Sequence, residues 1–181
     1  DIKTVVEYDF VITNLIAIIA VGVIILITFR SVAIPILLIF TIQSSIWMNM
    51  AIPYFTGSPL IFIGYMIVSA VQLGATIDYA ILLTSKYMYN RRTQTRYEAA
   101  EGAICASGNS IITSAAIMSA AGFTLGFISG VPSIAALGML IGRGALLSCL
   151  MVLTLLPQLL MAGDGLIRFS TAGHSFINAK N

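Results

Sequence analysis

The stretch that decides the fold is residues 60–86, LIFIGYMIVSAVQLGATIDYAILLTSK. It is apolar apart from a few uncharged polar residues, and one acid, Asp78, precedes the closing Lys86. A helix crosses about 30 Å of hydrocarbon with about 20 residues, because each residue adds about 1.5 Å. The stretch is therefore long enough to span a membrane. An acid inside such a span marks it as a candidate functional element.

Four more apolar stretches lie on either side of this one, at residues 10–29, 32–53, 110–128 and 134–161. Of the 181 residues, 59% are hydrophobic and 9% are charged, with a mean hydropathy of +1.00, which excludes an ordinary soluble domain. The runs are continuous, unlike the ten-residue alternation of a membrane β-barrel. The sequence predicts an all-α polytopic membrane bundle of about five transmembrane helices over residues 1–163, followed by a tail at 164–181.

The connections between the predicted spans are mostly short. Arg30 and Ser31 predict a tight turn, and residues 53–59 and 129–133 predict compact loops. Residues 87–109 form a longer, polar connection. Within it, residues 97–106 are expected to form a helix, either along the membrane surface or as an extension of the fourth span.

The basic residues fall almost entirely on one side of this five-span arrangement. That side carries Arg30, Lys86, Arg91, Arg92, Arg96, Arg168 and Lys180, and the other side carries Lys3. The positive-inside bias then predicts a plasma-membrane protein with its N-terminus outside and its C-terminus in the cytoplasm. The acidic start lacks the basic region of a secretory signal peptide, and the first residue is not Met. We therefore expect a piece of a longer chain.

Asp78 is the residue on which the functional prediction depends. It is the only acid between Asp9 and Glu98, and it lies about eight residues, or about 12 Å, before Lys86. An ionised carboxylate at that depth costs several kcal/mol unless it is paired or hydrated. We expect its side chain to face the bundle interior and to bind and release a proton. A purely structural hydrogen-bonding or ion-pairing role is the alternative.

Polar residues near Asp78 favour a transport role. Gln72, Gly74 and Tyr79 lie on the same predicted helix and are expected to form a small polar patch with the acid. The fourth span adds hydroxyls that could pass protons to the carboxylate: Ser110, Thr113, Ser114 and Ser119. For any one of these, service as a small residue in close helix packing is the stronger interpretation.

Arg143 is the second charge within the predicted spans. Gly142 and Gly144 flank it and would let another helix or a carbonyl approach closely. Its depth differs from that of Asp78 by about a dozen Å, so direct pairing is not expected. Arg143 could instead cap carbonyls, meet a partner chain or bind a lipid headgroup.

Small and polar residues predict how the helices pack. Gly122 with Gly126, and Gly138 with Gly142, form GxxxG pairs that favour close contact. The second span carries a polar run around Trp47, made of Gln43, Ser44, Ser45 and Asn49. This run is costly against lipid, so it should face protein, water or substrate, or serve simply to hold helices together.

Several kinds of chemistry are not expected. Cys105 and Cys149 fall near the inner surface and within the last span, so no disulfide is predicted. His174 lies in the tail without neighbouring ligands, so neither a metal nor another cofactor is expected. An intramembrane protease needs two carboxylates, or a serine with a buried histidine, so no catalytic residue and no enzyme activity are predicted.

Beyond these patterns, the sequence resembles a known family. The third span and its loop, GATIDYAILLTSKYMYNRR (74–92), resemble the signature of the mycobacterial membrane protein large (MMPL) transporters, part of the resistance–nodulation–division (RND) superfamily. Further segments resemble the family in order, especially members from Gram-positive bacteria: ITFRSVAIPILL (27–38), AIPYFTG (51–57), FIGYMIVSAVQLGATIDYAIL (62–82), IITSAAIMSAAGFTLGFIS (111–129) and IGRGALLSCLMVLTLLP (141–157). Nearly the whole chain is covered.

The resemblance implies a proton-driven exporter of lipids or hydrophobic compounds. It implies that Asp78 and Tyr79 relay protons, that Thr113 matches a relay hydroxyl, and that Gln72, Ser114 and Arg143 are supporting intramembrane residues. Complete members have two homologous halves of six spans, each with a large porter domain. This chain resembles spans two to six of one half, so the expected partners are the other half, the porter domains, membrane lipids and a lipid-like substrate, and no nucleic acid.

The same five-span block also resembles the sterol-sensing domain. That resemblance implies the alternative function, a lipid-sensing or regulatory membrane module without transport of its own. Proton-coupled flux that requires Asp78 favours the exporter. Lipid-dependent partner binding that does not require Asp78 favours the sensor.

Overall fold

The computed structural model describes residues 2–56 and 62–170. These residues form six helices: α1 (Ile2–Phe29), α2 (Ala33–Thr56), α3 (Phe62–Asn90), α4 (Arg96–Ile128), α5 (Pro132–Ala162) and α6 (Asp164–Ser170). Helices α1 to α5 each contain a stretch long and apolar enough to cross a membrane. The predicted all-α polytopic bundle is confirmed. Lys180 and His174, which carry two of the predictions above, lie outside the described residues.

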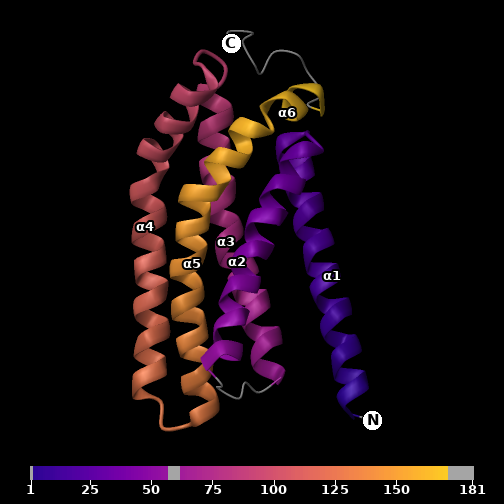
Figure 1. Cartoon of the computed structure of the whole chain (residues 1–181), viewed down its shortest axis with the longest axis vertical. Coiled ribbons are helices and arrows are strands. Elements are labelled where there is room, and N and C mark those ends of the chain that lie inside the picture. The colour runs from indigo at the N-terminus through magenta and orange to yellow at the C-terminus, as the bar shows by residue number, and fades with distance from the viewer. Residues whose placement is uncertain (1, 57–61, 171–181) are drawn as a thin grey trace.

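Helices α1 to α5 run up and down along the long axis of the molecule (Figure 1). Helix α6 and the turns α1–α2 and α3–α4 lie at one end, which we call the α6 end. The start of α1 and the α4–α5 turn lie at the opposite end, the N-terminal end. Helices α4 and α5 are side by side, whereas α1 diverges from the others toward the N-terminal end. Helix α1 is therefore the least buried span.

Local signals set the helix boundaries. Arg30 adopts the left-handed region, with φ of 49°, and reverses the chain between α1 and α2 as the predicted tight turn requires. The Thr95 side chain accepts from the Glu98 backbone N–H, and the Glu98 carboxylate accepts from the Thr95 N–H at 3.0 Å. This capping box starts α4 at Arg96. Residues 97–106 are thus an extension of the fourth span, one of the two predicted forms.

The predicted GxxxG pairs form the contact between α4 and α5. A Cβ added at Gly122 would lie 2.5 Å from the backbone nitrogen of Gly142, and one added at Gly138 would lie 2.6 Å from that of Gly126. The Ser119 hydroxyl donates to the Gly142 carbonyl at 2.9 Å. At Gly122 and Gly138 the two backbones come into direct contact, which is the close contact that GxxxG pairs favour.

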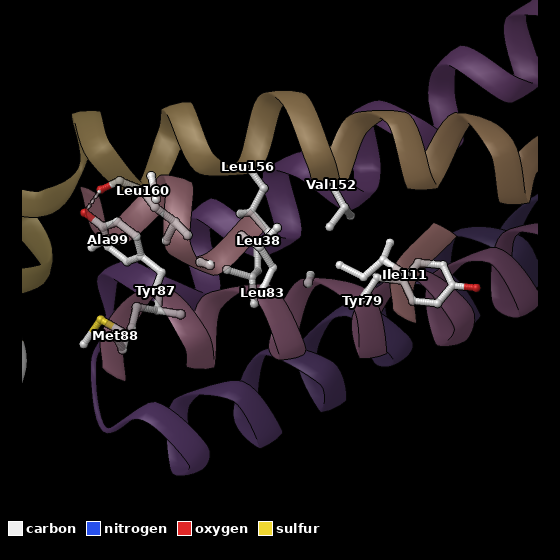
Figure 2. Close-up of a cluster of buried hydrophobic side chains, with 14 of the residues drawn as sticks. Leu38, Tyr79, Leu83, Tyr87, Met88, Ala99, Ile111, Val152, Leu156 and Leu160 are labelled. Carbon is white, nitrogen blue, oxygen red and sulfur yellow. Dashed lines mark hydrogen bonds between the residues drawn. The ribbon is translucent and has the colours of Figure 1, made fainter. Parts of the chain in front are cut away.

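An apolar core fills the half of the bundle near the α6 end. Figure 2 shows this core between α2, α3, α4 and α5. Its fully buried members include Leu38, Leu83, Leu156 and Leu160. Tyr79 lies at the end of the core that faces the middle of the bundle. The core therefore ends near Tyr79, and beyond it α3 buries the polar side chains of Thr76 and Gln72.

A partly buried ion pair ties α6 to Arg91, the residue that follows α3. The Arg91 guanidinium donates from Nε to Asp164 Oδ1 at 3.0 Å and from Nη2 to Oδ2 at 2.7 Å. The Tyr87 hydroxyl donates to the same Oδ1 at 3.1 Å. Hydrogen bonding to Asp164 is the main cause that raises the pKa of Arg91. The first part of the predicted tail is thus a helix fixed to the bundle.

Replacing Asp164 by asparagine is expected to lower the stability of the bundle. The change leaves the Arg91 charge without its bidentate acceptor, and hydrogen bonds to charged groups contribute about 1.5–3 kcal/mol. Unfolding of the full-length protein in detergent measures the loss. In a double-mutant cycle with Arg91→Met, most of the cost should disappear in the double variant. Additive costs would show that the pair does not stabilise α6.

Candidate functional site

Helix α3 has one strongly buried face, and most of the residues along it are polar. Gln72, Thr76, Ala80 and Thr84 follow one another at four-residue spacing and are all buried. Each residue turns the helix by about 100°, so Asp78, two residues from both Thr76 and Ala80, points to the opposite side. Asp78 is exposed on this bundle. The expectation that its side chain faces the interior of this bundle is wrong, because the buried face of α3 belongs to the other side of the helix.

Asp78 lies in a groove between α3 and α4. The groove has a volume of about 340 Å³ and is lined by Ala75, Tyr79 and Leu82 from α3 and by Ser110, Ile111 and Ser114 from α4. Within the described residues the carboxylate forms no ion pair and no hydrogen bond. The structure therefore brings two of the predicted hydroxyls, Ser110 and Ser114, into the same groove as the acid.

The other two predicted hydroxyls point elsewhere. Thr113 is exposed outside the groove, and its hydroxyl donates to the Asn109 carbonyl at 2.8 Å. It precedes Ser114 by one residue and is turned about 100° from it. Ser119 is used in the contact with Gly142. A relay role for Thr113 stays a prediction that this geometry does not support.

Tyr79 separates two spaces. Its side chain, 8% exposed, lines the Asp78 groove and also a small cavity of about 10 Å³, room for about one water molecule. The polar residues that line this cavity are Gln72, Thr76 and Ser148. In Figure 2 the Tyr79 ring points away from Leu83 and the rest of the apolar core. The Tyr79 side chain therefore stands between the acid and the buried polar residues behind it.

Those buried residues form a hydrogen-bonded group that we call the polar cluster: Ser45 and Asn49 from α2, Gln72 and Thr76 from α3, and Ser148 from α5. Gln72 is its centre. Its Oε1 accepts from Asn49 at 2.9 Å, and its Nε2 donates to Ser45 at 3.0 Å and to Ser148 at 3.1 Å. The predicted patch of Gln72 with Asp78 is therefore wrong, because Gln72 points to α2 and α5.

Gly144 leaves the space that the polar cluster occupies. A Cβ at this position would lie 2.6 Å from Asn49 Nδ2 and 2.8 Å from Gln72 Oε1. Gly142, on the other side of Arg143, instead contacts Phe123 and the α4 backbone. Both glycines permit a close approach, as predicted. Gly142 lets helix α4 come close, whereas Gly144 makes room for the side-chain amides of Asn49 and Gln72.

Arg143 restores a hydrogen bond that a proline removes. Pro53 lies within α2, four residues after Asn49, and its missing N–H leaves the Asn49 carbonyl without its helical donor. Arg143 donates to that carbonyl from Nη2 at 3.5 Å and to Asn49 Oδ1 from Nε at 3.0 Å. Of the predicted alternatives, carbonyl capping is what the structure shows. In the described part of the chain, Arg143 forms no ion pair with Asp78.

Sequence reasoning missed the polar cluster as a unit, although a signal was present. Ser45 and Asn49, and likewise Gln72 and Thr76, are four residues apart and so share a helix face. Pro53 continues the same spacing after Asn49. Two polar faces in neighbouring spans indicate a shared hydrogen-bonded contact. No three His, Cys, Asp or Glu side chains in residues 2–56 and 62–170 come together to hold a metal ion.

Residues 2–56 and 62–170 form five apolar spans with a buried polar cluster between α2, α3 and α5, and within them Asp78 on α3 has no ion pair. These features define a polytopic α-helical membrane protein. The MMPL family model matches residues 1–172, and the chain belongs to this family. It is 32% identical over 158 residues to the membrane protein ActII-3 of Streptomyces coelicolor, covering 84% of this chain and 22% of that protein. The chain thus spans about a fifth of that relative's length. No solved structure matches it.

Proposed function

We propose that the chain is the membrane part of a proton-driven exporter of lipids or hydrophobic compounds, in which Asp78 and Tyr79 relay protons. Membership of the MMPL family supports the class of protein. The observation that carries the proposal is the Asp78 carboxylate, which lies in a groove with Tyr79 and the hydroxyls of Ser110 and Ser114 without an ion pair in the described residues. The proposal gives no residue a catalytic role.

The position of Asp78 supports proton exchange. Hydrocarbon around an ionised carboxylate costs several kcal/mol, so a carboxyl group at this depth tends to bind a proton unless water or a cation reaches it. The groove offers hydroxyls that can donate to the charged form and accept from the neutral one. Both states of Asp78 thus have a neighbour that can stabilise them.

The exposure of Asp78 in this groove also supports the presence of a further segment of protein beside this bundle. An exposed acid on a membrane helix is costly against lipid, so another part of the transporter should cover it. The other half of a longer chain, with its porter domains, fits this role, and ActII-3 is several times longer than this chain. Arg30, Arg91 and Arg96 lie at the α6 end, which supports a plasma-membrane protein with that end in the cytoplasm.

In this mechanism the protonation state of Asp78 biases two arrangements of the helices. The neutral carboxyl tolerates the apolar walls of the groove, whereas the ionised form draws hydroxyls and water toward it. A proton gradient then populates the two arrangements in turn, and the attached porter domains move the cargo.

A flux measurement tests this function. The complete transporter is reconstituted into vesicles with a fluorescent lipid, and a pH difference is imposed in each direction. Lipid movement should follow the pH difference, reverse with its sign and stop when a protonophore removes it. Lipid-dependent binding of a protein partner without any pH-driven flux would overturn the exporter and favour the sensing module.

A further inference from the structure

The polar cluster joins three helices at one point. Gln72 on α3 bonds to Ser45 and Asn49 on α2 and to Ser148 on α5. Thr76 adds a second bond from α3 to Ser148, at 2.8 Å. The small cavity beside Thr76 has room for about one water molecule, which cannot replace all of these partners, so separating the helices leaves several buried groups unsatisfied. The cluster therefore resists any motion of α3 relative to α2 and α5.

The cluster is also adjacent to the proposed proton site. Thr76 lies about half a turn from Asp78 on the same helix, and Tyr79 is among the residues that line the small cavity beside Thr76. The titratable or charged groups near this region are Asp78 and Tyr79 on α3 and Arg143 and Cys149 on α5. Helices α2 and α4 present amides and hydroxyls to it. A displacement of α3 caused at Asp78 therefore acts directly on the cluster.

On its far side the cluster reaches a weakened part of α2. Asn49 accepts from Arg143 with both its side chain and its backbone carbonyl, at the position where Pro53 removes the helical hydrogen bond. A helix that lacks this bond can bend there. The position of the last turns of α2 is thus set by Arg143 and by the amide that Gln72 holds in place.

We infer that Gln72 is a positioning residue that transmits movements of α3 to the last turns of α2, at its C-terminal end, through Asn49 and Arg143. The inference rests on the proposed function, since Asp78 supplies the movement. Gln72 neither binds the transported proton nor contacts the cargo. Gln72 makes α2, α3 and α5 move as one body. A movement of α3 that starts at Asp78 therefore reaches the C-terminal end of α2.

Two variants break the cluster in different ways. Gln72→Leu removes all the hydrogen bonds of the central amide, whereas Gly144→Ala keeps every polar group and displaces the two amides by adding one carbon atom. Gln43→Leu is the matched control: Gln43 lies on α2, outside the polar cluster, and its buried side-chain oxygen has no hydrogen-bond partner in the described residues. If Gln72→Leu does not fold, Gly144→Ala carries the test.

The experiment uses the complete transporter with spin labels at Phe55→Cys on α2 and Phe127→Cys on α4, two highly exposed sites at the N-terminal end. Helix α4 is a fixed reference because its glycines hold it to α5. The wild type and Gln43→Leu should give a narrow distance distribution. Gln72→Leu and Gly144→Ala should broaden it by several Å and lower pH-driven flux about tenfold, with the pH of half-maximal flux unchanged.

The outcomes separate this inference from the proposed function. Narrow distances and normal flux in Gln72→Leu, equal to Gln43→Leu, would overturn the inference and leave the exporter intact. A shift of the half-maximal pH in Gln72→Leu would also overturn it, because the residue would then belong to the proton site itself. If the proposed exporter function is wrong, the wild-type protein itself shows no pH-driven flux.

Discussion

Replacing Gly122 by leucine is expected to abolish the folded bundle. A Cβ at this position lies 2.5 Å from the Gly142 nitrogen and 2.9 Å from the Gly138 oxygen, and both of these are backbone atoms that cannot rotate away. The larger side chain forces α4 and α5 apart and breaks the hydrogen bond from Ser119 to the Gly142 carbonyl. Overpacking costs about 1–3 kcal/mol where side chains can adjust, so a backbone clash should cost at least about 3 kcal/mol.

The amount of folded protein in the membrane and its resistance to denaturant measure this effect. Gly130→Leu is the control, because a Cβ at Gly130 meets nothing within 4 Å. Gly122→Leu should yield little folded protein while Gly130→Leu resembles the wild type. Equal stability of the two variants would contradict the backbone contact between α4 and α5.

The second large effect is functional. Asp78→Asn should reduce pH-driven flux to the level of empty vesicles, because the amide has nearly the shape of the carboxylate but cannot release a proton in this pH range. The fold should survive, since Asp78 lies at the surface of the bundle and forms no hydrogen bond within the described residues. Flux is measured with an imposed pH difference, and the yield of folded protein is measured beside it. The two measurements separate a loss of proton transfer from a loss of folding.

The chain offers a matched control for that variant. Asp164→Asn is the same substitution at an acid whose carboxylate pairs with Arg91 at the α6 end. It should lower stability and leave the pH dependence of transport unchanged. Full pH-driven flux in Asp78→Asn would show that Asp78 does not relay protons, whatever the behaviour of Asp164→Asn.

The architecture could be predicted because hydrophobicity and backbone geometry determine it directly. Residues 60–86 indicate a span by length, and Arg30 and Ser31 indicate a turn by their position between two spans. The glycine pairs, Gly122 with Gly126 and Gly138 with Gly142, indicate a close helix contact, which the structure shows. These features depend on residues near one another in sequence.

The direction of Asp78 could not be predicted in the same way. A membrane helix can be apolar on its lipid-facing side and on its protein-facing side, so hydrophobicity gives the depth of a residue and not the side it faces. The four-residue spacing of Gln72, Thr76 and Ala80 marks the buried face only once their partners are known. Those partners, such as Ser148, lie far away in sequence.

Arg143 shows a case in which the information was present but ambiguous. Its flanking glycines predict a close approach, and carbonyl capping was one of three alternatives. Choosing it requires knowing that Pro53 lies inside α2 and not at its end, because a proline inside a helix frees the carbonyl four residues earlier. The predicted span ended at residue 53, which hid that carbonyl.

Direct observation of the Asp78 proton shows whether this carboxyl group exchanges protons during transport. Infrared difference spectra of the complete transporter in lipid are recorded between low and high pH. We predict a C=O band of a protonated carboxyl group that fades over the pH range in which flux changes, is absent from Asp78→Asn and is retained in Asp164→Asn. Identical spectra for wild type and Asp78→Asn would show that this carboxyl group does not exchange protons, and would contradict the account.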